Sequence, residues 1–203
     1  MYIPEHFRME SSSILHFVKD NPFGILVSNV DGKMEATHLP LLVSSDQKFL
    51  IGHFAKPNPQ KNSLNQEVLC IFPGPHSYIS PSWYETNRSV PTWNFTAVHI
   101  KGILTYMEDP QEIQNSLKTL VQTFESHDSS YKLSEVDKDY LIGLEKGIVP
   151  FRIQITELEG KEKLSQNHTR DRRLRVIENL ERMPGENEKA IAKLMKQSLD
   201  QNS

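Results

Sequence analysis

The chain has 203 residues, of which 37% are hydrophobic and 24% are charged, and its formal net charge is −3. This composition is typical of a globular protein, and the small negative charge gives no general attraction to nucleic acid or to an anionic membrane. No apolar run approaches the roughly 20 residues that a membrane-spanning helix needs, so we expect no membrane association. No signal-peptide pattern opens the sequence, and the lone Cys70 excludes an internal disulfide, so we expect a cytoplasmic protein.

The first elements in chain order are a helix and several short strands. Serines at positions 11–13 can cap a helix that ends near Asn21. Asp31-Gly32 is a strong hairpin turn signal. A turn that opens a short helix is expected at residues 57–62. The strands expected around these signals cover residues 23–29, 34–44, 48–55 and 68–72.

The segment from Phe72 to His99 alternates aromatic, proline and hydroxyl side chains with a period close to two. A strand places successive side chains on opposite faces, whereas proline limits strand pairing to edges, bulges and turns. We therefore expect one further strand in the aromatic part and another over residues 92–107. Such aromatic strands shape a ligand pocket or a subunit contact, and the alternative is a core sheet with irregular corners.

Helical patterns return after the strands. Asp109-Pro110 predicts a helix start, with Glu112 placed to reach back to the cap. An apolar stripe follows at helical spacing: Ile113, Leu117, Leu120, Val121 and Phe124. A helix over residues 134–146 and a strand over residues 148–158 come next. The predicted fold is mainly β with flanking helices (α+β), with a barrel domain of residues 1–167 and an appended C-terminal helical hairpin of residues 168–203.

No catalytic or metal-binding signature is present. The eight histidines form no HxH or HxxxH pair, and the sequence has no CxxC and no GxSxG. We therefore predict no catalytic residue and no metal site. Histidines of different strands remain candidates to line one cavity, and the alternative is that they bind backbone carbonyls at strand ends: His38, His53, His76 and His99.

The turn after the third strand contains the kinds of side chain that a phosphate-binding site needs. Lys56 and Lys61 supply positive charge, Asn58 and Gln60 supply amide donors, and a helix start offers free N–H groups. A phosphate monoester carries about −1.5 to −2 charge and accepts such donors. The segment has no glycine-rich phosphate motif. Its composition is therefore equally typical of a basic turn that is exposed to solvent and binds no ligand.

The C-terminal hairpin contrasts in charge with the rest of the chain. Residues 168–203 hold 8 Lys and Arg against 6 Asp and Glu, a net charge of +2, and residues 1–167 carry −5. The basic run from Arg170 to Arg175 is typical of a segment that contacts DNA. However, Glu178 stands at helical spacing from Arg175 and Arg182, which favours local pairing and a simple packed hairpin.

Several ordered motifs resemble one known family. They are MYIPEHF at residues 1–7, THLPLL at 37–42, GHFAKPNPQ at 52–60, GPHSYISPSWY at 74–84, VPTWNF at 90–95 and KLSQN at 163–167. Together they resemble the PaiB family of bacterial negative transcriptional regulators of sporulation and degradative enzyme (protease) synthesis. The resemblance implies an FMN-binding split β-barrel fold, and a homodimer with pockets at the subunit interface.

The resemblance to split-barrel flavoproteins also implies a set of FMN contacts. Thr37, His38 and Leu39 would face the isoalloxazine ring and the ribityl chain. The phosphate would be surrounded by His53, Ala55, Asn58, Gln60 and Lys61. Trp93, Asn94 and His99, from the same or the partner subunit, would close the pocket. The arginine-rich contacts of the pyridoxamine-phosphate oxidase branch are missing, so Lys and His must replace the bidentate fork of Arg.

These observations favour a regulator over an enzyme. The barrel would bind FMN or a related small phosphate-bearing ligand, and the protein would contact DNA directly or through a protein partner. The alternatives are an FMN-dependent oxidoreductase, in which the flavin performs the chemistry, and a haem-handling split-barrel protein with a histidine ligand. Fold alone does not separate the three.

Overall fold

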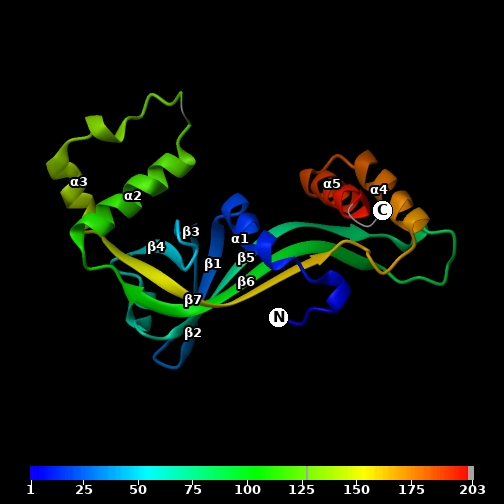
Figure 1. The fold of residues 1–203 in the computed structure, drawn as a ribbon, viewed down its shortest axis with the longest axis horizontal. Coiled ribbons are helices and arrows are strands. Elements are labelled where there is room, and N and C mark those ends of the chain that lie inside the picture. Colours follow the sequence, from blue (N-terminus) through cyan, green and yellow to red (C-terminus); the bar gives the residue numbers. More distant parts are fainter. Residues whose placement is uncertain (127, 201–203) are drawn as a thin grey trace. The chain divides into compact units, whose positions relative to one another are not determined.

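The computed structural model describes residues 1–126 and 128–200 (Figure 1). The chain divides into two compact units. Unit 1 consists of Met1–Phe17, Phe72–His99 and the chain from Glu159 onward, and unit 2 consists of Val18–Ile71 and Ile100–Leu158. The strands β5, β6 and β7 run through both units, so each unit contains one part of the same long strands.

The helices are α1 (Ser11–Asp20), α2 (Pro110–Phe124), α3 (Lys138–Glu145), α4 (Arg170–Arg182) and α5 (Glu186–Asp200). Short 3₁₀ helices are η1 (Glu5–Phe7), η2 (Pro59–Ser63), η3 (Pro81–Trp83) and η4 (Leu133–Glu135). The strands are β1 (Phe23–Val30), β2 (Lys33–Pro40), β3 (Leu42–Val43), β4 (Phe49–Ala55), β5 (Glu67–Ile79), β6 (Thr92–Tyr106) and β7 (Ile148–Lys163). No helix in the described part of the chain is both long and apolar enough to span a bilayer.

Unit 2 contains a sheet that curls until its two end strands meet. The strand order is β2-β1-β5-β6-β7-β4-β3, which places β2 and β3 at opposite ends. Yet β2 ends at Pro40 and β3 begins at Leu42, so a single residue, the fully buried Leu41, joins the two ends. The chain itself links the two ends of the sheet, but among the described residues no hydrogen-bonded ladder joins them, so the sheet is not closed.

The strand boundaries differ from the prediction at prolines. The strand expected over residues 34–44 is split in two at Leu41, directly after Pro40 ends β2. Conversely, the two strands expected over residues 68–72 and in the aromatic segment are one continuous strand, β5, which passes through Pro73 and Pro75. Strand β1 pairs with β5 only from Leu69 to Ile71. Because both prolines lie beyond this pairing, they need no N–H on the side of β1.

One part of the core of unit 2 lies where β4 pairs with β7. The rings of Phe54 and Phe151 lie 4.4 Å apart, and both side chains are fully buried. Gly52 belongs to this contact, because a Cβ there would lie 2.9 Å from Leu41 and 3.0 Å from Phe151. Helix α2 begins as predicted, with Asp109 accepting a 3.0 Å bond from the Gln111 backbone. Its Glu112 turns to Arg152 of β7, 3.0 Å away, and does not return to the cap.

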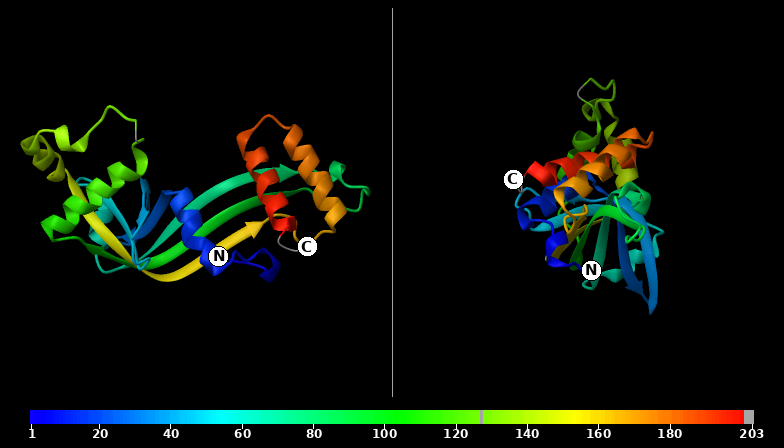
Figure 2. Two further views of the ribbon diagram at one scale, coloured as in Figure 1. Left: turned by 45° about the horizontal axis from the view of Figure 1, so that its top comes forward. Right: turned by 90° about the vertical axis from the view of Figure 1, so that its right-hand side faces the viewer.

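The core of unit 1 is the helical hairpin packed on β5 and on the end of β7. Helices α4 and α5 lie side by side (Figure 2). Ile79 of β5 and Leu164 just after β7 are buried in one cluster with apolar residues of both helices, among them Val176, Ile191 and Met195. The predicted hairpin is therefore present, whereas a domain boundary at residue 167 stays a prediction.

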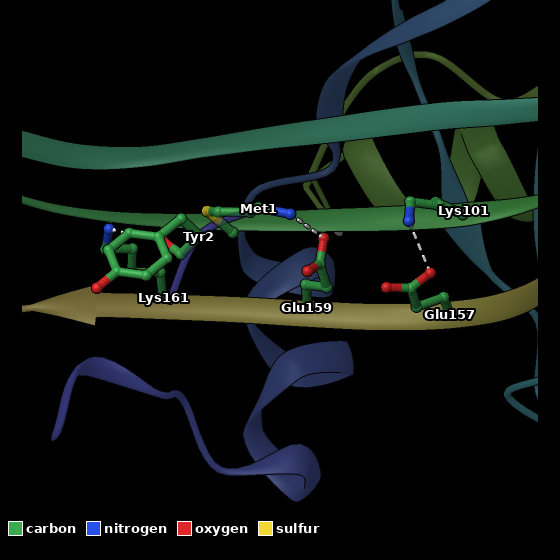
Figure 3. A network of polar contacts seen from close by, with 6 residues as sticks. All are labelled: Met1, Tyr2, Lys101, Glu157, Glu159 and Lys161. Atoms are coloured by element: carbon green, nitrogen blue, oxygen red, sulfur yellow. Dashed lines mark hydrogen bonds and ion pairs between the residues drawn. The ribbon is translucent and has the colours of Figure 1, made fainter. Parts of the chain in front are cut away.

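Ion pairs border β7 in each unit (Figure 3). In unit 1 the N-terminal ammonium of Met1 lies 2.6 Å from Glu159, and Lys161 donates a 3.1 Å bond to the carbonyl of Tyr2. In unit 2 Lys101 and Glu157 are 2.7 Å apart. The partly exposed pair of unit 2 contributes little to stability, whereas the N-terminal contacts fix the first residues of the chain to unit 1.

Candidate functional site

The predicted phosphate turn is held to strand β2 by Asn58. Asn58 caps η2, since its Oδ1 accepts a 2.9 Å hydrogen bond from the backbone N–H of Gln60. Its Nδ2 donates a 2.9 Å hydrogen bond to the Thr37 hydroxyl of β2. The structure thus brings together, within unit 2, one residue predicted to face the flavin and one predicted to face its phosphate.

Gln60 connects the turn to strands β1 and β2. Its side chain is only 1% exposed. The amide nitrogen donates to the carbonyl oxygens of Leu26 and Glu35 and to the Ser28 hydroxyl, at 3.2, 3.1 and 2.9 Å. Because these acceptors occupy the amide nitrogen, Gln60 positions the turn against β1 and β2. The sequence predicted that the Gln60 amide is a donor, but no sequence feature indicated the distant acceptors that it contacts.

The positive charges of the turn are placed at its surface. Lys61 donates a 2.9 Å hydrogen bond to the carbonyl oxygen of Lys56, which leaves two of its three N–H groups free of that contact. Lys56 is exposed. His53 of β4 is half-buried, and this burial lowers the pKa of its imidazole below the ordinary value of 6.5. His53 is therefore a neutral hydrogen-bonding group at pH 7.

The remaining predicted residues of unit 2 differ in exposure. Thr37 is half-buried, His38 is exposed with its ring 6.3 Å from that of Phe23, and Leu39 is buried. Ala55 is exposed at the end of β4. Thr37 and His38 therefore present a hydroxyl and an imidazole on β2, whereas Leu39 belongs to the core.

Trp93, Asn94 and His99 lie on β6 in unit 1. Trp93 is 52% exposed, and its ring lies about 6 Å from those of His76 and Tyr78. Asn94 is fully buried and donates a 3.0 Å hydrogen bond to Ser165. The structure therefore divides the predicted site residues between the two units, and Asn94 stabilises the core of unit 1.

Two further predictions can be compared with the structure. Among the side chains that the structure describes, no group of three or more His, Cys, Asp or Glu residues is arranged to hold a metal ion. His127 lies outside the described residues. In the arginine run, Arg173 is only 5% exposed and donates a 3.0 Å bond to Ser198, and Arg172 forms an ion pair with Glu85. Two of the arginines expected at a DNA contact thus have structural partners.

Two cavities lie away from this turn. One of about 410 Å³ in unit 2 lies between β3, β4 and α2, and its cation Arg152 is paired with Glu112. The other, of about 280 Å³ in unit 1, includes Lys163 of the KLSQN motif. Sequence reasoning gave Lys163 no role, although the motif that contains it contributed to the family resemblance.

An antiparallel sheet whose end strands are joined through one residue, with helices at its margins, is the split β-barrel that the family resemblance implied. Solved structures share this fold. The FAD and haem binding protein of Mycobacterium smegmatis matches with a TM-score of 0.61 and 11% identity, over 84% of this chain and 79% of that one. The flavocytochrome Anf3 of Azotobacter vinelandii matches with a TM-score of 0.60 and 13% identity, over 76% and 68%. The predicted fold class is confirmed.

The family is shown by sequence. Residues 1–157 match the family model described as "Putative FMN-binding domain". The chain is 38% identical to "Protease synthase and sporulation protein PAI 2" of Bacillus subtilis, over 98% of both chains. The chain therefore belongs to this FMN-binding-domain family, among the PaiB proteins that the motifs indicated.

Proposed function

We propose that this protein is a flavin-binding negative regulator of sporulation and of degradative enzyme synthesis. The observation that carries the proposal is the 38% identity to the Bacillus subtilis protein named for protease synthesis and sporulation, which extends over 98% of both chains. A match of this length covers the sheet, the turn at η2 and the C-terminal hairpin together, so it supports a shared role for the whole chain.

The turn at η2 is the proposed binding site for the FMN phosphate. Its donor set fits a phosphate monoester: two lysine ammonium groups, the Asn58 amide and the Thr37 hydroxyl, with no acidic side chain between Ala55 and Lys61. In this proposal Thr37 and His38 lie along the flavin, and His53, Ala55, Asn58, Gln60 and Lys61 hold or position the phosphate. Trp93 and His99 complete the pocket from the partner subunit of a homodimer, and the buried Asn94 holds their strand β6 in place.

Flavin binding is tested with the purified protein. An absorption spectrum distinguishes bound flavin from bound haem, and titration of FMN should quench its fluorescence. Lys61→Gln removes one ammonium from the turn and should weaken FMN binding about tenfold, the usual effect of one charge-assisted hydrogen bond. Lys33→Gln is the matched control, because Lys33 is an exposed lysine at the hairpin end of β2. The proposed site would be contradicted if the wild-type protein left FMN fluorescence unquenched, or if both variants lost FMN affinity equally.

Regulation is tested in cells. Expression of this protein in a Bacillus subtilis strain lacking PAI 2 should lower secreted protease activity and reduce sporulation. Direct DNA binding is tested with promoter fragments, whose affinity should fall steeply with salt because phosphate contacts release counterions. Failure to change protease or spore yield would contradict the regulatory role, whereas repression without DNA retention would assign the contact to a protein partner.

A further inference from the structure

The cavity around Lys163 in unit 1 has no role in the function proposed above. Its volume is about 280 Å³. Three segments line it: the loop from Tyr84 to Val90, the start of β6 at Thr92, and the chain from Lys163 to His168, with Arg172 of α4 beside them. It shares only Asn94 with the residues of the proposed flavin site.

Lys163 brings an uncompensated charge to the cavity. Its ammonium donates to the Thr92 hydroxyl and, at 2.8 Å, to the carbonyl oxygen of Trp93. No carboxylate among the described side chains forms an ion pair with it. Burial and the neighbouring charge of Lys161 lower the pKa of Lys163. An ammonium has three N–H groups, so one remains for a ligand.

Arg88 adds a second positive charge to the cavity, whereas Arg172 and His168 add little. Arg88 is exposed in the loop, and its guanidinium has no carboxylate partner in the described ranges. Arg172 is neutralised by Glu85 and lies 5.6 Å over the ring of Tyr84. His168 stacks on the same ring at 5.3 Å, and burial together with the charge of Arg172 lowers the pKa of its imidazole. Among the described residues that line the cavity there is no Asp or Glu.

A purely structural role does not account for this arrangement. Two hydrogen bonds from Lys163 tie β6 to β7, and a neutral donor would provide them equally well. Removing an ammonium from water without an anion costs free energy, and a bound anion would offset that cost. The ammonium of Lys161, two residues earlier on β7, differs from that of Lys163. It lies over the rings of Tyr2 and Phe95 and does not line the cavity.

We propose that this cavity binds a small oxyanion, the phosphate or carboxylate group of a metabolite, between Lys163 and Arg88. Oxyanions accept charge-assisted hydrogen bonds from ammonium and guanidinium groups. Ser89 and Asn167 supply further polar groups at the wall. The volume of about 280 Å³ is just below the range for ligand pockets, about 300–1,000 Å³, which favours a compact ligand over a nucleotide. The regulator would thus have a second ligand site besides the one for flavin.

The test is isothermal titration calorimetry of the full chain with two probes, inorganic phosphate and malonate, at an ionic strength held constant with chloride. We expect one of them to bind with millimolar or better affinity, and the stronger probe identifies the phosphate or carboxylate source. Lys163→Gln should weaken binding about tenfold or more, because one charge-assisted contact is lost. Arg88→Gln should act in the same direction. Lys161→Gln, two residues away on the same strand, should leave the affinity unchanged.

Two results would overturn the proposal. One is the absence of binding heat with either probe at millimolar concentration, and the other is an equal loss in Lys161→Gln and Lys163→Gln, which would reveal only general charge attraction. Should Lys163→Gln fail to fold, as judged by its thermal transition, Arg88→Gln decides, because Arg88 is exposed and far less constrained. FMN titration of the same variants separates this site from the flavin site, and we expect FMN affinity to be unaffected.

Discussion

The side-chain amide of Asn58 donates a 2.9 Å hydrogen bond to the hydroxyl oxygen of Thr37. The same Asn58 side chain caps η2, so one residue connects the turn to strand β2. Through this contact the two parts of the proposed FMN site, the flavin strand and the phosphate turn, hold a fixed position within unit 2. Loss of the contact should therefore affect the ligand more than the fold.

Replacing Thr37 with valine tests this contact. The change keeps the shape of the side chain and removes the acceptor of Asn58. A typical hydrogen bond contributes about 0.5–1.5 kcal/mol, so we expect FMN affinity to fall roughly threefold to tenfold with a small change in thermal stability. Thr156→Val, at an exposed position of β7, is the control and should bind FMN like the wild type. Unchanged affinity in Thr37→Val would show that the contact has no role in binding.

Gln60 should matter for stability. Its buried amide donates to two backbone carbonyls and to the Ser28 hydroxyl, and Gln60→Leu would remove all three contacts. The Ser28 hydroxyl would keep only the hydrogen bond that Ser63 donates to it. We expect the free energy of unfolding to decrease by about 2–4 kcal/mol, measured by urea denaturation. Gln114→Leu on the exposed surface of α2 is the matched control and should change it by less than about 0.5 kcal/mol. Similar stabilities for the two variants would refute the anchoring role.

Local signals in the sequence were sufficient for much of the fold. Asp31-Gly32 predicted the β1–β2 hairpin, and Asp109-Pro110 predicted the start of α2, because turn and cap geometry depend on neighbouring residues. The family motifs then indicated the split barrel. These predictions required no knowledge of which distant segments meet.

Features that depend on distant partners could not be predicted. Pro73 and Pro75 argued against a continuous β5, but the end of β1 pairing at Ile71 leaves one edge of the strand free there. The acceptors of Gln60 lie on two other strands, and the partners of Arg173 lie on another helix. Such contacts follow from packing, which periodicity and composition do not specify.

Close packing at Gly102 gives a third prediction. A Cβ at this position would lie 2.4 Å from the carbonyl oxygen of Gln154, which is backbone and cannot move aside easily. Gly102→Ala should destabilise the protein by about 1–3 kcal/mol, as overpacking does. Gly143→Ala in α3 meets nothing within 4 Å and should be neutral or stabilising by up to about 1 kcal/mol, because alanine favours a helix. Chemical denaturation of the two variants measures the contrast, and equal effects would contradict the packing.

Burial of His53 predicts a loss of stability in acid. The folded protein keeps the pKa of His53 below 6.5, so at mildly acidic pH the unfolded chain binds a proton that the folded chain does not. Stability is therefore fully present above about pH 6.5 and declines as the pH falls towards the folded pKa. Urea denaturation across this range should show a smaller decline for His53→Gln than for the wild type. His6→Gln, at an exposed position, should leave the decline unchanged, and an equal decline in all three proteins would contradict the prediction.

Cys70 should be chemically inert in the native state. Its side chain is fully buried in β5, and burial strongly raises the pKa of the thiol. Since the thiolate is the reactive form, an aromatic disulfide reagent should react with the folded protein only as fast as the fold opens, and within seconds to minutes after denaturation in guanidinium. Gln60→Leu offers an internal check, because a less stable fold should expose the thiol sooner. Rapid reaction of the native wild-type protein would show that Cys70 is accessible and that β5 is less tightly packed than the structure indicates.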